Sequence, residues 1–241
     1  MNRDPFYRAS APFAPVRQTP PPQIRMAGTR GLIAAFALAL LVPLQIHAQD
    51  PASDLPEAAK KGDVDAVKSL LNKGANVNAK NGIGRTALME ASYWGRVDAA
   101  KLFIEKAADV NAKDQEDRTA LMDAAGNGHL QVVLALLEKG ADPNAKNKEG
   151  STALIEAASN NRADVIKALI DKKASVDEKD KDGRSALILA AYWGHEDAAQ
   201  ALIDKGANIA ARDKYGYSAM MYAKRENHAK VVDVLAKAGA K

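Results

Sequence analysis

The segment Thr119-Ala120-Leu121-Met122 has a counterpart 33 residues away in both directions, and this spacing decides the fold. The related segments begin at Thr86, Thr119, Thr152, Ser185 and Ser218, with no insertion or deletion between them. A fixed period of this length indicates a repeat array, in which one supersecondary unit stacks on the next. The period therefore predicts one continuous solenoid, which offers a surface for binding rather than a deep pocket.

The unit over residues 114–146 shows what each period builds. A polar, turn-like segment precedes Thr119, a residue type that caps helix N-termini, so we expect a short helix to follow it. Gly128 interrupts the pattern, and a second helix is expected from roughly Leu130 to Glu138, where apolar residues recur at helical spacing. Gly140 is expected to end this helix as a C-cap residue in the left-handed backbone conformation, before the chain turns back. Each period therefore predicts a pair of helices and a connecting loop.

These features resemble the ankyrin repeat family over residues 53–241. The matching signals are the T-x-L helix start, the Ala-Ala pair, Gly128-His129, the Leu-Leu pair, and Gly-Ala-Asp with Asn-Ala-Lys after it. The sequence departs from the family pattern in having Ala where Pro is usual after Thr, and Met or Ile where His is usual. The resemblance implies an all-α repeat solenoid of helix-turn-helix pairs with β-hairpin finger loops.

The period also sets the domain boundaries. We expect a domain over 53–241 with an N-terminal cap, in which Asp54-Leu55-Pro56-Glu57 opens a helix with Pro56 at an early position. Six helix pairs should result. The five repeats that follow the cap are expected at about 81–113, 114–146, 147–179, 180–212 and 213–241.

Three positions lack the glycine found in neighbouring repeats. Ala107 and Lys173 stand where other repeats have a C-cap glycine, and Asn161 replaces the glycine between two helices. A non-glycine residue in the left-handed region costs on the order of 1 kcal/mol. We therefore predict that the unit over 147–179, which holds two of these positions, frays first.

The residues before the array have the pattern of an export signal. Arg25 and Arg30 precede an apolar run from Leu32 to Val42, and Ala48 is a suitable cleavage point, although Ile46 is larger than is usual there. We expect a signal peptide over 26–48 with cleavage after Ala48, followed by a linker over 49–52. The run is short for a transmembrane helix, so we expect no stable membrane insertion after cleavage, with an uncleaved anchor as the alternative.

The Pro-rich residues 1–25 make an unusually long leader. They are expected to be either a disordered extension or the product of a mis-assigned start, with translation beginning at Met26 rather than Met1. Periplasmic localisation in a Gram-negative bacterium is the first expectation, and secretion is the alternative. The complete absence of cysteine is compatible with an oxidising compartment.

Charge and composition exclude several function classes. Residues 1–48 hold five arginines against Asp4 alone, so they account for the net charge of +4 and leave 29 basic and 29 acidic side chains elsewhere. A balanced chain has no electrostatic reason to bind phosphate backbones, so we expect no nucleic-acid partner. The sequence shows no nucleophile motif, phosphate loop or zinc spacing, and Gly82-Ile83-Gly84 lacks the context of a nucleotide fingerprint. We expect neither catalysis nor a metal or cofactor.

The family resemblance implies that a protein partner binds the concave face, formed by finger tips and the exposed ends of the first helices. Mapping this pattern selects finger and helix-end residues as candidate partner-binding positions. They are Arg85, Tyr93, Trp94, Arg118, Asn127, Asn160, Arg184, Tyr192, Trp193, Tyr215 and Tyr217. Trp, Tyr and Arg are the residue types enriched at binding hot spots.

Each prominent residue type also has a structural interpretation. Trp94 and Trp193 could instead cover the neighbouring repeat. The histidines at 129, 195 and 228 are expected to pack and hydrogen-bond between loops, because they lie too far apart to share a metal ion. The carboxylates of Glu90, Asp123 and Glu156 recur in register and are expected to be solvated or ion-paired, although they could receive a basic partner.

The sequence therefore predicts an exported, monomeric scaffold that binds one protein partner through its concave face. Rigid stacked helices would present a preorganised surface and reduce the ordering cost of association. Two alternatives use the same surface: a secreted effector that acts on a host or competitor protein, and a helper that protects or assembles another periplasmic enzyme.

Overall fold

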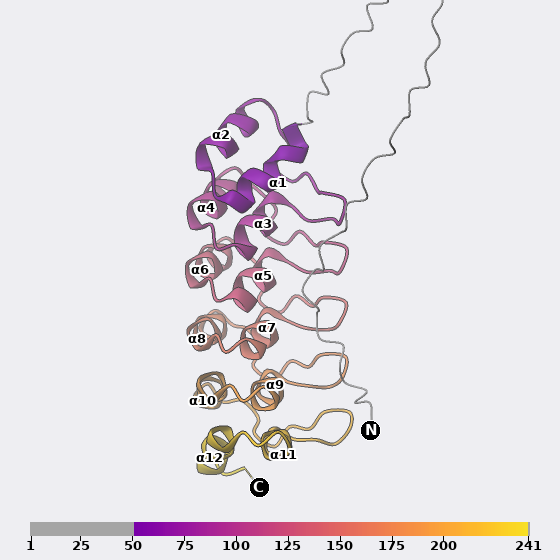
Figure 1. The fold of residues 1–241 in the computed structure, drawn as a ribbon, viewed down its shortest axis with the longest axis vertical. Coiled ribbons are helices and arrows are strands. Elements are labelled where there is room, and N and C mark those ends of the chain that lie inside the picture. The colour runs from indigo at the N-terminus through magenta and orange to yellow at the C-terminus, as the bar shows by residue number, and fades with distance from the viewer. Residues whose placement is uncertain (1–50, 241) are drawn as a thin grey trace, which may run out of the picture. The chain divides into compact units, whose positions relative to one another are not determined.

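The computed structural model describes residues 51–240, which form twelve helices in six antiparallel pairs (Figure 1). The expectations for residues 1–25, 26–48, Ala48 and the first two linker residues lie outside the described residues. The first helices of the pairs are α1 (Pro51–Lys61), α3 (Ala87–Tyr93), α5 (Ala120–Asn127), α7 (Ala153–Ser159), α9 (Ala186–Tyr192) and α11 (Ala219–Arg225). The second helices are α2 (Val64–Asn72), α4 (Val97–Glu105), α6 (Leu130–Glu138), α8 (Ala163–Asp171), α10 (Glu196–Asp204) and α12 (Ala229–Lys237).

The helix starts follow from the capping residues that the period identified. Each first helix from α3 to α11 begins after a buried Thr or Ser whose hydroxyl accepts a hydrogen bond from the amide three residues on, as Thr119 does from Met122 at 3.4 Å. This contact satisfies an amide that would otherwise lack a partner. The predicted helix pair of the second repeat, with Gly128 in the left-handed conformation between its helices, is confirmed.

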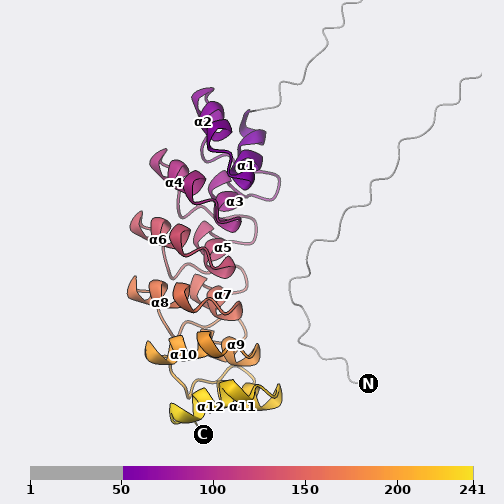
Figure 2. The same cartoon turned by 60° about the vertical axis from the view of Figure 1, so that its left-hand side comes forward.

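The pairs stack in order, with the first helices in one row, the second helices in another and the fingers projecting to one side (Figures 1 and 2). One hydrophobic cluster runs through the stack from Leu55 to Leu235, and alanines in the first helices allow the rows to approach closely. Burying a leucine such as Leu169 contributes roughly 1.5–3 kcal/mol. The repeats are therefore held by a continuous core without disulfides.

Polar side chains also connect each repeat to the next at the base of the fingers. Lys80 Nζ donates to the carbonyl of Lys113 at 2.7 Å, and the same bond recurs 33 residues later at Lys113, Lys146 and Lys179. Asn78 Oδ1 accepts from the amide of Asp109 at 2.8 Å, a contact that also recurs in register. These bonds fix the spacing between fingers.

The histidines connect repeats as well, which confirms their predicted structural role. Nε2 of His129 lies 3.0 Å from the carbonyl oxygen of Tyr93, and His195 and His228 reach the preceding repeat in the same way. At the equivalent positions, Arg96 and Arg162 donate from Nε to the corresponding carbonyl. Two residue types thus satisfy the C-terminal carbonyls of the first helices.

Five non-glycine residues with positive φ refine the sequence-based picture. Ala107, Asn161 and Lys173 adopt positive φ of 58°, 56° and 71°, as predicted from the missing glycines. Asn227 and Asp117 share this conformation and were not anticipated, although Asp117 stands in register with finger glycines such as Gly84 and Gly150.

The start of the first helix differs from the prediction. Helix α1 begins at Pro51 rather than near Asp54, so Pro56 lies inside the helix and not at its first turn. Pro51 itself suits a first helical position because its missing N–H needs no partner there. The helix is held at this place by Leu55 and Ala59, which are buried against the next pair.

Candidate functional site

The predicted binding residues fall into two rows of the array. Tyr93, Trp94, Asn127, Asn160, Tyr192 and Trp193 lie at the ends of first helices, whereas Arg85, Arg118, Arg184, Tyr215 and Tyr217 lie on the fingers. The two rows differ in environment. In the helix-end row Tyr93, Trp94, Asn160 and Trp193 are exposed while Asn127 and Tyr192 are partly buried, whereas three of the finger residues are arginines engaged with carboxylates.

The two tryptophans are the most exposed large rings of the helix-end row. Trp94 and Trp193 directly follow α3 and α9 and are 44% and 47% exposed. Each indole meets the ring of the preceding tyrosine edge-on, with centroids 5.3 Å apart at Tyr93 and 4.8 Å at Tyr192. Lys60 Nζ lies 5.5 Å from the centroid of Trp94. Each tryptophan is thus supported from one side and leaves much of its surface open.

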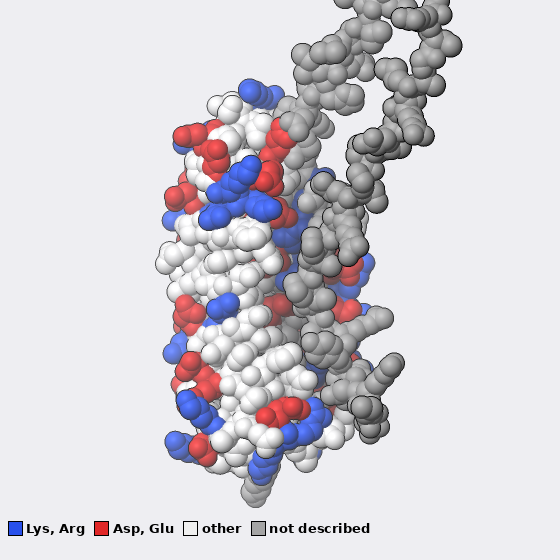
Figure 3. All heavy atoms as spheres, viewed as in Figure 1, with Lys and Arg blue, Asp and Glu red and all other residues white. Residues whose placement is uncertain are grey.

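The helix ends between the two Tyr–Trp pairs carry uncharged polar groups. The side-chain amides of Asn127 and Asn160 donate at 2.9 Å to the carbonyls of Asp123 and Glu156. Within residues 51–240 no hydrogen bond is made by the side-chain oxygen of either asparagine, so both oxygens can accept one. Figure 3 shows charged side chains gathered near the α1 end and the α11–α12 end of this face, with a mostly uncharged surface between them.

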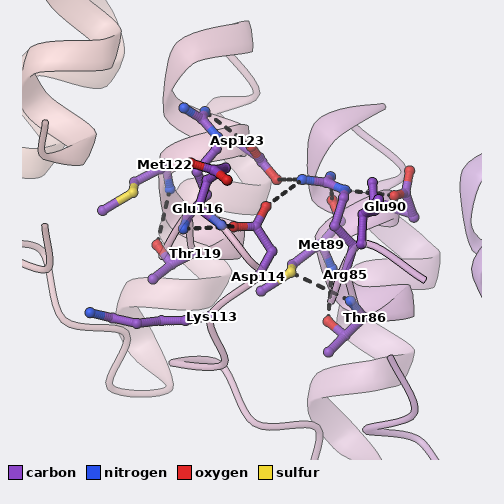
Figure 4. A network of polar contacts seen from close by, with 12 residues as sticks. Arg85, Thr86, Met89, Glu90, Lys113, Asp114, Glu116, Thr119, Met122 and Asp123 are labelled. Atoms are coloured by element: carbon purple, nitrogen blue, oxygen red, sulfur yellow. Dashed lines mark hydrogen bonds and ion pairs between the residues drawn. The ribbon is translucent and has the colours of Figure 1, made fainter. Parts of the chain in front are cut away.

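The finger arginines belong to a partly buried network of ion pairs. Arg85 reaches Glu90 in its own repeat at 2.7 Å and Asp123 in the next repeat at 2.9 Å (Figure 4). Asp114 Oδ2 lies 3.4 Å from the same guanidinium. Burial alone lowers the pKa of Arg85, but Asp123 and Glu90 outweigh it and raise that pKa above its ordinary value. Arg85 therefore stays charged with its side chain only 12% exposed.

Arg118 extends this network into the following repeat. It pairs with Asp123 at 3.1 Å and with Glu156 at 3.2 Å, so one carboxylate, Asp123, is shared by two arginines. Asp123 is 1% exposed, and its burial raises the pKa of the carboxyl while Arg85 and Arg118 oppose the shift. All three carboxylates of the first-helix row are thus ion-paired within the chain, as one of the two sequence interpretations predicted.

The last two fingers are arranged differently. Arg184 pairs with Asp180 at 2.7 Å and with Asp182 at 3.3 Å, within its own finger. Tyr215 and Tyr217 are exposed on the next finger, where Tyr217 lies 5.2 Å from the ring of Tyr222. The C-terminal part of the finger row is therefore more aromatic than the N-terminal part.

The register places Arg225 in the helix-end row, but sequence reasoning did not foresee the aromatic cluster around its guanidinium. Its guanidinium lies 4.9 Å from the ring of Tyr222, 5.5 Å from Tyr217 and 6.0 Å from Tyr192, within the range of cation–π attraction. The Tyr222 hydroxyl donates to Asp213 at 2.6 Å, and burial together with this bond raises the pKa of Tyr222. The repeat register did contain a signal, because Arg225 occupies the position of Tyr93 and Tyr192.

The arrangement offers binding groups rather than reactive ones. In residues 51–240 no three His, Cys, Asp or Glu side chains gather closely enough to hold a metal ion. A hollow of about 440 Å³ lies between α8 and α10, away from the candidate rows, and its polar lining includes Asp164, Lys167 and Asp197. None of the helices within the described range has the length and apolar character needed to span a bilayer.

Stacked helix pairs with projecting fingers define an α-helical repeat protein, and comparison with known proteins gives its family. The family model for ankyrin repeats (3 copies) matches residues 55–147 and 154–241, so the chain belongs to the ankyrin repeat family. It is similar to the crystal structure of an ankyrin repeat domain from Acinetobacter baumannii AYE, with 31% sequence identity and a TM-score of 0.70. That match covers 78% of this chain and 98% of the other. Among curated proteins, none matches the sequence.

The family assignment confirms the predicted fold and its coarse function. Ankyrin repeat domains are generally protein-interaction scaffolds and are typically non-catalytic. The individual contact residues, the partner and the compartment are addressed below as proposals.

Proposed function

We propose that the chain is an exported scaffold that binds one protein partner through its helix-end row, with the Tyr93–Trp94 and Tyr192–Trp193 pairs as anchors. The observation that carries the proposal is that both tryptophans stay nearly half exposed while a tyrosine ring supports each of them. Rings held in this way bury large area at low entropic cost when a partner covers them.

The surface between the anchors favours an uncharged contact. Asn127 and Asn160 keep free acceptor oxygens there, and the finger arginines at 85 and 118 use their donors within the chain. A partner segment that spans the two repeats between those of Trp94 and Trp193 could therefore receive aromatic contacts at both ends and hydrogen bonds in the middle. Arg184, Tyr215 and Tyr217 would extend the contact on the finger side.

Site-specific photocrosslinking in the native compartment tests this proposal. A photoreactive amino acid at position 94 or 193 should capture the same protein. The matched control is position 101, which is exposed on α4 away from the first-helix ends, and it should capture nothing at that mass. Capture of the same protein with equal yield from position 101, or of none from 94 and 193, would refute the assigned surface.

Export to the periplasm is part of the proposal and rests on Arg25, Arg30, the apolar run over 32–42 and Ala48. Fractionation tests it, and N-terminal sequencing of the mature chain should begin at Gln49. Retention in the periplasm supports a resident scaffold or a helper for another enzyme. Appearance in culture medium or host lysate favours a secreted effector, and a cytoplasmic chain with an intact N-terminus would refute export.

A further inference from the structure

One apolar position of the repeat is buried in every repeat except the last. Met89, Met122, Ile155 and Ile188 occupy this position and are between 1% and 3% exposed, whereas Met221 is 43% exposed. Another helix pair follows each of the four earlier repeats, whereas within residues 51–240 none follows α11 and α12. The last described repeat therefore displays a side chain that the register assigns to the core.

Arg212 lies directly beside this methionine. Its Nη1 is 3.4 Å from Met221 Sδ and 2.6 Å from the carbonyl oxygen of Gly216. At the four equivalent positions a lysine instead donates to the next repeat, as Lys179 does to Arg212 at 2.9 Å. In the last described repeat, Arg212 thus bonds within its own repeat, whereas the equivalent lysines bond to the next repeat.

A second cation follows Met221 on the same helix. Lys224 is exposed one turn later on α11, where the earlier repeats have the buried small residues Ser92, Ala125, Ala158 and Ala191. Neither Arg212 nor Lys224 has a carboxylate within ion-pair distance among residues 51–240, although most other arginines of the array do. Met221 therefore shares its exposed surface with two cations, Arg212 in direct contact and Lys224 three residues on along α11, and neither forms an ion pair among residues 51–240.

The finger that leads into α11 adds aromatic surface to the same repeat. Tyr215 and Tyr217 are exposed there. We call Arg212, Tyr215, Tyr217, Met221 and Lys224 the end surface. An exposed apolar patch with charged residues at its rim can mark a protein-interaction site. A two-fold contact with a second copy would bring these cations towards one another, which disfavours that occupant.

We propose that the end surface binds an acidic segment of a protein partner, which places an apolar side chain on Met221 and carboxylates against Arg212 and Lys224. The contact shares Tyr215 and Tyr217 with the finger side of the proposed partner surface, but it does not use the tryptophans of the helix-end row and does not depend on them. Because both cations are exposed, the attraction should weaken as salt is added.

Methyl NMR of the full chain labelled at the methionine ε-methyl groups tests this proposal. The probes are two synthetic peptides of equal length and apolar content, one carrying glutamates and the other lysines. The glutamate peptide should shift the Met221 signal to saturation, leave Met89 and Met122 in place, and bind less tightly at higher salt. The lysine peptide should have no effect.

Introduction of a negative charge at the centre of the surface, and at a control position, supplies the matched variants. Met221→Glu should weaken binding of the glutamate peptide at least about tenfold. Ile83→Glu alters an equally exposed apolar residue on the first finger, and it should leave the affinity unchanged. A Met221 signal that both peptides shift equally, or that neither shifts, would overturn the proposal. So would a shift on concentrating the chain alone with formation of dimers in sedimentation, which would assign the surface to a second copy.

Discussion

Asp123 Oδ2 lies 2.9 Å from Arg85 Nη1, so a carboxylate on α5 is held by an arginine from the preceding finger. Its other oxygen lies 3.1 Å from Arg118, and Arg118 continues to Glu156 in the next repeat. Three successive repeats are therefore joined by alternating charges on the finger side of the first helices. Two of the predicted binding arginines, Arg85 and Arg118, therefore stabilise the stacking of the repeats.

Loss of the central carboxylate should destabilise the protein strongly. Asp123→Asn keeps the shape of the side chain but leaves two partly buried arginines without their shared partner, which should cost about 3–5 kcal/mol in urea unfolding. The control is Asp182→Asn, whose side chain is 31% exposed and whose partners Arg184 and Lys214 are 33% and 48% exposed, and its cost should be much smaller. Similar losses of stability in the two variants would show that the buried network stabilises the array no more than an exposed ion pair does.

Replacing Lys173 by glycine should stabilise the array. Lys173 has a φ of 71°, whereas glycine occupies the equivalent positions 140 and 206 with φ of 84° and 83°. Lys173→Gly should therefore gain about 1 kcal/mol in thermal or urea unfolding. Asn161→Gly should gain less, because Asn161 Oδ1 also accepts a hydrogen bond from the amide of Ala198 at 3.1 Å. A larger gain at 161 than at 173 would contradict this reasoning.

The unit over 147–179 should open first under native conditions. It holds two non-glycine residues in the left-handed conformation, Asn161 and Lys173. Amide hydrogen exchange should show weaker protection in α7 and α8 than in α5, α6, α9 and α10. Lys173→Gly should narrow the difference, and uniform protection across these six helices would rule the prediction out.

Acidification should destabilise the array through His195. Burial lowers the pKa of His195 below its ordinary value of 6.5, and the nearby positive charges of His228 and Arg162 act in the same direction. The unfolded chain therefore takes up this proton first, so stability falls as the pH drops through about 6.5 towards the folded pKa. NMR titration of the His195 ring should give a midpoint below 6.5.

The variant His195→Arg provides the control for that effect. Arg96 and Arg162 occupy equivalent positions and already donate to the preceding carbonyl, at 2.9 Å and 3.3 Å. The arginine should keep the bond to Ser159 and remove the contribution of residue 195 to the pH dependence of unfolding. An unchanged pH dependence would mean that other groups cause it.

Removing both tryptophans should affect binding more than stability. Trp94→Ala with Trp193→Ala deletes two rings that are nearly half exposed, so each change should cost no more than about 1 kcal/mol of stability. Binding of a crosslinked partner should fall at least about a hundredfold if both rings are anchors. A large drop in melting temperature with binding intact would favour the interpretation that the rings cover neighbouring repeats.

Several features of the site followed from register alone, and others did not. The capping role of Thr119, the helix-end position of Trp94 and the left-handed conformation of Lys173 could each be predicted, because a local residue type recurs at a known place in the unit. The sharing of Asp123 by Arg85 and Arg118 could not, because the partners come from different repeats and their rotamers decide which carboxylate each arginine meets.

By itself, the sequence determined the repeat, its helix pairs and its family, since a 33-residue period with caps in register leaves one way to bury the apolar face of each unit. The tertiary structure decided which of the recurring residues remain available. Met89 and Met221 occupy the same position in the unit, but Met89 is buried and Met221 is exposed. The difference arises because, among residues 51–240, another repeat stacks on the repeat of Met89 and none stacks on the repeat of Met221. Exposure depends on neighbours along the stack, and no single repeat contains that information.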